Sequence, residues 1–138
     1  MTTAWVLDAS ILAAFFLREP EACKLDAVLQ DCIAGAAEFH APSLLPYEMT
    51  NILLMAVRRS RISDEQRASI LLDWELIPVT LHPAPTPQDR ARILSLADRH
   101  RLSAHDAAYL ELAERIQARL LTLDDALLKL KRSSRWIA

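Results

Sequence analysis

Four acidic residues stand in apolar surroundings, where an unpaired charge is costly: Asp8, Glu48, Asp106 and Asp124. The clearest case is Asp8, which interrupts the apolar run W-V-L-D-A-S-I-L-A-A-F-F at positions 5–16. A carboxylate that leaves water without a partner costs several kcal/mol or takes up a proton. The rest of the chain must therefore supply Asp8 with a partner, and the nature of that partner bears on function.

The other three acids occupy comparable positions. At about 100° per residue, Glu48 falls inside the apolar arc of its predicted helix. On another predicted helix, Asp106 falls between Leu110 and Ala113 on the apolar side. Both Glu48 and Asp106 are therefore expected to face inward. Asp124 follows L-L-T-L, which has the length and composition of a buried strand.

Inward carboxylates without a matching set of inward arginines or lysines cannot all be neutralised as ion pairs. Either some acids stay protonated, or a cation binds among them. Ligands that are all oxygens suit Mg²⁺ or Mn²⁺, whereas zinc sites usually include His or Cys. Taken singly, Asp8 and Asp124 could each cap a helix, and Glu48 could pair with one buried arginine. A cap explains neither Glu48 nor Asp106.

Composition limits the class of protein. With 138 residues, 52% apolar residues, 25% charged residues and a net charge of −2, the chain is expected to form one globular domain over residues 1–138. A nucleic acid would have to be held by a local patch of positive charge. Gly35 is the only glycine, which excludes a P-loop and a dinucleotide-binding fingerprint, since each needs several.

The cysteines and the N-terminus favour a reducing cytoplasm. Cys23 and Cys32 lie in one predicted helix, on opposite faces and roughly 13 Å apart along its axis, so they cannot form a disulfide there. The N-terminal M-T-T-A-W has no basic segment, and the longest apolar stretch is too short to span a bilayer. We expect no membrane partner.

Strand and helix patterns alternate along the chain. The predicted strands are 4–7, 38–41, 76–80 and 119–123, with a further edge strand possible at Trp136. The predicted helices are 9–17, 20–34, 43–59, 63–74, 86–99, 103–117 and 124–132, with caps at Ser63, Thr86 and Ser103. Pro78 argues that the third strand lies at an edge.

This alternation predicts an α/β sandwich around a mostly parallel sheet. The ligand crevice of such a fold lies beyond the carboxyl ends of the strands, where the strand order reverses. If the first and fourth strands are neighbours, Asp8 and Asp124 open onto one crevice.

Four segments together resemble the signature of PIN-domain proteins. They are V-L-D-A-S, P-S-L-L-P-Y-E-M-T-N, S-A-H-D-A-A-Y-L-E-L-A and L-L-T-L-D-D-A-L, and their order and spacing are most similar to those of VapC-type ribonuclease toxins. The resemblance implies a PIN-like three-layer sandwich and one or two Mg²⁺ or Mn²⁺ ions. It implies hydrolysis of RNA, a cognate antitoxin as partner and a homodimer.

The same resemblance assigns roles to individual residues. The positions that match catalytic metal ligands are Asp8, Glu48, Asp106 and Asp124, and those that match accessory polar positions of the pocket are Ser10, Asn51 and Thr122. Asp125 could add a fifth carboxylate or be a solvated acid in the first turn of a helix. His105 departs from the pattern, because similar sequences often have an aromatic residue there.

Two basic segments, 58–61 and 129–132, could follow an RNA backbone or could simply favour the ends of helices. Two other functions fit parts of the sequence. A PIN-like scaffold could bind RNA or a protein without catalysis. A receiver-like domain, which accepts a phosphoryl group on an aspartate, would explain the α/β pattern, but it calls for paired acids after the first strand and for an aspartate closing the third.

Overall fold

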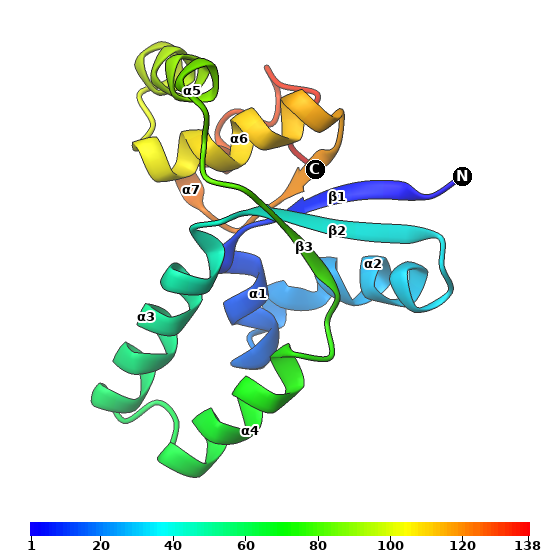
Figure 1. The fold of residues 1–138 in the computed structure, drawn as a ribbon. Coiled ribbons are helices and arrows are strands. Elements are labelled where there is room, and N and C mark those ends of the chain that lie inside the picture. The colour runs from blue at the N-terminus through cyan, green and yellow to red at the C-terminus, as the bar shows by residue number, and fades with distance from the viewer.

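Strands and helices alternate along the chain in the computed structural model, which describes residues 1–138 (Figure 1). The strands are β1 (Thr3–Leu7), β2 (Ala37–Pro42), β3 (Val79–His82) and β4 (Arg119–Leu121). The helices are α1 (Ala9–Phe16), α2 (Cys23–Ile33), α3 (Leu45–Arg58), α4 (Asp64–Trp74), α5 (Pro87–His100), α6 (Ala104–Ile116) and α7 (Asp125–Leu128). A 3₁₀ turn, η1 (Pro20–Ala22), precedes α2.

The four strands form one sheet in the order β3-β2-β1-β4, and every neighbouring pair is parallel. The inner strands are β1 and β2. Val6 of β1 lies opposite His40 of β2 on one side and opposite Leu120 of β4 on the other. Val6 and Leu7 are fully buried, which explains why the end of β1 is a continuous apolar run. β3 is an edge strand, as Pro78 indicated.

Helices cover both faces of the sheet. Figure 1 shows α1, α2, α3 and α4 on one side and α5, α6 and α7 on the other. Large buried side chains from both layers meet the sheet, among them Phe39 of β2, Met49 of α3 and Leu110 of α6. The predicted three-layer α/β sandwich with a parallel sheet is confirmed.

Three predicted helix starts are confirmed by their caps. The Ser63 side chain accepts a hydrogen bond from the Gln66 backbone and opens α4, and the Thr86 side chain does the same from Asp89 at α5. At α6, the Ser103 side chain accepts from the backbone of Asp106. The caps therefore fix where the helix that carries Asp106 begins.

The C-terminal prediction was wrong in extent. The helix predicted for 124–132 ends at Leu128, because the following backbone groups bond three residues back, as Lys131 does to Leu128. This tighter winding returns the chain to the sheet, where Ile137 forms a single parallel bridge with Leu120. The edge strand considered at Trp136 is thus one bridge. The fourth strand ends at Leu121, two residues earlier than predicted.

Both cysteines are free, as expected from their places on α2. Gly35 follows that helix with a positive φ of 76°, a conformation that glycine adopts without strain. No helix in the structure has the length and apolar character needed to cross a membrane.

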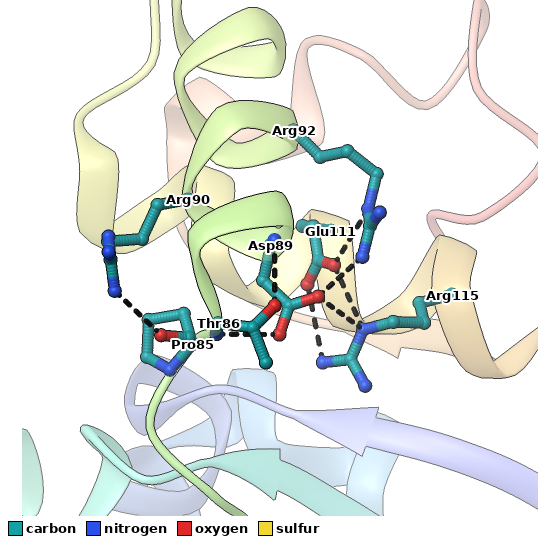
Figure 2. Close-up of polar contacts among 7 residues, drawn as sticks. All are labelled: Pro85, Thr86, Asp89, Arg90, Arg92, Glu111 and Arg115. Carbon is teal, nitrogen blue, oxygen red and sulfur yellow. Dashed lines mark hydrogen bonds and ion pairs between the residues drawn. The ribbon is translucent and has the colours of Figure 1, made fainter.

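A polar cluster joins α5 to α6 (Figure 2). Glu111 of α6 is only 3% exposed, and its carboxylate accepts hydrogen bonds from Arg92 at 3.3 Å and from Arg115 at 2.9 Å. Asp89 of α5 contacts both arginines and also bonds the backbone of Thr86. Because α6 carries Asp106, this cluster helps to fix the position of one candidate site residue.

Candidate functional site

Two acids meet where the strand order reverses. β1 continues to β2 and β3 on one side, while the last strand, β4, joins its other side. Asp8 directly follows β1, and its backbone N–H donates to Leu121 at the end of β4 at 3.4 Å. Asp124 lies three residues beyond Leu121. The condition set by the sequence analysis, that the first and fourth strands be neighbours, is met.

Asp8 is buried and fully bonded to neutral donors. Its side chain is the cap of α1, where Oδ1 accepts from the Ile11 backbone at 3.2 Å. Ser10 Oγ donates to Oδ1 at 2.5 Å, and the Thr122 hydroxyl donates to Oδ2. Only 4% of Asp8 is exposed. The carboxylate thus has several hydrogen-bond donors and no positive charge beside it.

The two hydroxyls also join the loops around Asp8. Ser10 Oγ accepts from the Leu123 backbone at 2.8 Å, and Thr122 Oγ1 accepts from the Asp124 backbone at 2.9 Å. The turn after β1 is therefore fixed to the turn after β4. The structure brings both predicted accessory residues, Ser10 and Thr122, to Asp8.

Glu48 is held by Tyr109, a buried residue of the helix that carries Asp106. Tyr109 is 2% exposed, and its hydroxyl donates to Glu48 Oε1 at 2.6 Å. Glu48 lies in the first turn of α3, whereas Tyr109 lies on α6, three residues after Asp106. That spacing places Tyr109 near the helix face of Asp106 and was the one available signal.

Asp124 and Asp106 each keep carboxylate oxygens free. Asp124 caps α7, where its Oδ2 accepts from the Leu127 backbone at 3.1 Å, and its Oδ1 has no partner. The Asp106 carboxylate, in the first turn of α6, enters no ion pair, and the Ser103 hydroxyl is the one side-chain donor beside it. Both side chains are half-buried. Partly exposed carboxylate oxygens of this kind are available to a ligand.

The acids are close enough for their charges to interact. Burial raises the pKa of Asp8 to about 6, and the charge of Asp124 contributes, while the bonds from Ser10 and Thr122 oppose the rise. Partial burial and the charge of Asp124 also raise the pKa of Asp106. Burial, together with the hydrogen bond to Glu48 and the charges of Glu48 and Asp8, raises the pKa of Tyr109, which therefore stays a donor.

No basic residue neutralises the four acids. Every ion pair in the structure involves other carboxylates, namely those of Glu19, Glu38, Asp64, Asp89 and Glu111. The expectation that arginines and lysines do not close this group is confirmed.

One expectation needs correction. Glu48 and Asp106 do not point fully away from water: both are half-buried, and of the four acids only Asp8 is buried. In addition, no three carboxylate, histidine or cysteine side chains stand close enough to form a ready metal-binding group. Repulsion between like charges opposes their convergence when no cation is present.

The remaining candidates lie outside this group. Asn51 is exposed on α3, one turn after Glu48. Asp125 is exposed in the first turn of α7, which fits the solvated first-turn acid that the sequence analysis considered. His105 is exposed, and its charge opposes the rise in the pKa of Asp106.

The donor set fits a hard divalent cation. The unpartnered atoms are carboxylate oxygens, and the buried Asp8 has no other source of positive charge. Such oxygens suit Mg²⁺ or Mn²⁺ better than zinc. Three of these acids would have to move closer together to bind one ion.

Comparisons with known proteins agree with this arrangement. The family model of the PIN domain matches residues 5–133. "Ribonuclease VapC3" of Pyrobaculum aerophilum is 32% identical over 121 residues, which cover 86% of this chain and 88% of that protein. "Ribonuclease VapC9" of Mycobacterium tuberculosis is 30% identical over 119 residues, which cover 86% and 84%.

The fold also matches a solved structure. In the crystal structure of VapBC2 from Rickettsia felis, bound to a DNA fragment from its promoter, one chain aligns with a TM-score of 0.66. The alignment covers 98% of this chain and 96% of that one, at 16% identity. At that identity the match concerns the fold alone.

Proposed function

The chain belongs to the PIN-domain family, and on that premise we propose that it is an endoribonuclease that uses Mg²⁺ or Mn²⁺. One observation carries the proposal: the buried carboxylate of Asp8 faces Asp124 across the β1–β4 junction, and no basic residue neutralises either acid. The relatives named as ribonucleases support RNA as the substrate.

Each residue then has a part in the reaction. The side chains that would hold the ion are Asp8, Glu48, Asp106 and Asp124. When bound, the ion supplies positive charge at the scissile phosphate and makes water a stronger nucleophile. Ser10 and Thr122 hold the Asp8 carboxylate in place, and Tyr109 orients Glu48 through its short hydrogen bond.

The biological role follows from the same relatives. We propose that the chain is the toxin of a toxin–antitoxin pair and that a cognate antitoxin inhibits it. The relatives named VapC, at 30% and 32% identity, support this role. That residues 1–138 form one PIN domain, that the protein is a homodimer and that it acts in the cytoplasm stay predictions.

The alternatives fit less well. A receiver-like domain calls for an aspartate closing the third strand, but β3 ends at His82 and lies at the sheet edge. A scaffold without catalysis has no need for four unneutralised acids around one junction. Binding of Mn²⁺ distinguishes this scaffold from the nuclease.

The test uses Asp8→Asn, which keeps the shape of the side chain and removes its charge. We expect cleavage of a labelled single-stranded RNA in Mg²⁺ or Mn²⁺ to fall at least a hundredfold. Asp98→Asn, which removes an exposed carboxylate of α5, should cleave at the wild-type rate.

Circular dichroism would verify that the variant is folded. Full activity of purified Asp8→Asn, with contaminating nucleases excluded, would overturn the proposal. Wild-type protein that neither binds Mn²⁺ nor cuts RNA would favour the non-catalytic scaffold.

A further inference from the structure

A hollow of about 230 Å³ lies along α3 and the turn that follows it. Its lining combines three apolar side chains with one amide and two arginines: Asn51, Ile52, Met55, Ala56, Arg59 and Arg61. None of the catalytic acids lines it. It therefore forms a surface separate from the four carboxylates.

The hollow continues the helix face that carries Glu48. Asn51, Met55 and Arg59 follow Glu48 by three, seven and eleven residues, and these spacings keep them on one side of a helix. At ~1.5 Å per residue, Arg59 lies about 16 Å from Glu48 along the axis. One face of α3 thus passes from an acidic end to a basic end.

Arg59 is the free cation of this hollow. It is exposed and enters no ion pair. Arg61 also lines the hollow, but its guanidinium bonds Glu19 at 2.8 Å. A free guanidinium in the same hollow as Asn51 and three apolar side chains could bind a phosphate, a ribose and the face of a base.

An RNA strand that reaches four carboxylates needs positive charge on either side of them. α3 supplies that charge within about five nucleotide steps, at the ~3.4 Å rise of a stacked strand. Figure 1 shows that α3 runs away from the sheet edge where β2 ends, so a strand leaving the crevice can follow it outward. Along this face of α3 the charge changes from negative at Glu48 to positive at Arg59. An RNA strand that leaves the acids along α3 would therefore meet the positive charge that it requires.

We propose that this hollow binds the RNA strand on one side of the cleavage site and that Arg59 contacts a backbone phosphate. The inference rests on the proposed ribonuclease function and adds a substrate-binding site to it. An acidic peptide from a protein partner is the competing occupant. RNA is favoured because the hollow lies in line with the candidate centre.

The experiment compares Arg59→Gln with Arg58→Gln. Both remove one exposed arginine at the end of α3, but Arg58 does not line the hollow. With an RNA that has at least six nucleotides on each side of the cut, Arg59→Gln should raise KM roughly five- to tenfold with kcat unchanged. Arg58→Gln should match the wild type.

Substrate length and salt sharpen the test. The effect of Arg59→Gln should disappear when the RNA is trimmed to two nucleotides on one side of the cut, and only on that side. Binding of labelled RNA, measured by fluorescence anisotropy in the Asp8→Asn background, should show a salt slope smaller by about 0.7, as expected for one lost phosphate contact.

The outcomes separate the two proposals. Wild-type protein without RNA cleavage contradicts the proposed function, whereas anisotropy still reports whether Arg59 binds RNA. Equal KM, RNA affinity and salt slope in wild type, Arg58→Gln and Arg59→Gln would overturn the proposed RNA-binding site. It would also be overturned if Arg59→Gln lost the binding of a protein partner while its RNA affinity stayed the same.

Discussion

At the residue scale, Asp8 combines two roles that its sequence presented as alternatives. It caps α1 through the Ile11 backbone, and it is also buried near enough to Asp124 for the charge of Asp124 to raise its pKa. Neutral hydroxyls of Ser10 and Thr122 supply hydrogen bonds without balancing its charge. A cap usually stabilises a helix at no electrostatic cost, but this one carries a buried charge.

The charge of Asp8 should destabilise the metal-free fold at neutral pH. Its pKa rises from 3.8 to about 6 on folding, so the folded protein holds the proton more tightly than the unfolded chain. The resulting stabilisation is complete below pH 3.8 and is lost as pH rises through about 6. At ~1.4 kcal/mol per pKa unit, the free energy of unfolding changes by about 3 kcal/mol between these two limits.

Asp8→Asn should therefore raise the melting temperature in EDTA at pH 7.5 by several degrees. The gain should vanish near pH 4, where the wild-type carboxyl is protonated. Thermal unfolding between pH 4 and 8 measures this, with Asp98→Asn as the control. A sharp fall of the melting temperature in Asp8→Asn would show that the charge is needed for structure.

At the scale of elements, local signals predicted the structure well and long-range contacts escaped them. The caps at Ser63, Thr86 and Ser103 are interactions within four residues, and the structure has each of them. The early end of α7 coincides with backbone bonds to the third residue back, and the bridge of Ile137 to Leu120 that follows joins distant residues, which no local pattern contains.

The hydrogen bond between Tyr109 and Glu48 joins residues 61 positions apart on two helices. Apolar periodicity placed Tyr109 in the core but gave no partner for its hydroxyl. The four acids themselves could be found, because a charge at an apolar position stands out in any sequence. The partial exposure of Glu48 and Asp106 could not be found in this way, because it depends on how their helices pack in the fold.

Tyr109 links α6 to α3 and should set the direction of Glu48. Tyr109→Phe removes the donor and keeps the ring, so we expect Mn²⁺ affinity, measured by calorimetry, to fall roughly tenfold. The control is Tyr47→Phe. Tyr47 precedes Glu48 and is 81% exposed, so the loss of its hydroxyl should leave Mn²⁺ affinity at the wild-type value.

A mutant cycle shows whether Tyr109 acts through Glu48. In the Glu48→Gln background, Tyr109→Phe should cause little further loss of Mn²⁺ affinity, because the oriented carboxylate is already gone. Additive losses would mean that Tyr109 supports the site in another way, through packing of the α3–α6 interface.

At the scale of the whole molecule, the strand order decides whether the acids can cooperate. The sequence predicted a strand before Asp8 and another before Asp124, but no pattern in either shows that they are neighbours. The order β3-β2-β1-β4 supplies that fact and places the crevice between β1 and β4. The net charge of −2 conceals this local concentration of negative charge.

A divalent ion that binds this crevice should stabilise the entire fold, because the unfolded chain does not hold the acids together. At a free concentration a hundred times its Kd, such an ion adds about 2.7 kcal/mol to the free energy of unfolding. The gain in melting temperature with Mn²⁺ should be large at pH 7.5 and small at pH 5, where Asp8, with a pKa of about 6, holds a proton that competes with the ion.

Differential scanning fluorimetry at the two pH values measures both gains. Asp8→Asn should lose most of the gain at pH 7.5, whereas Asp98→Asn should keep it. An equal gain in both variants would mean that Mn²⁺ binds elsewhere on the protein.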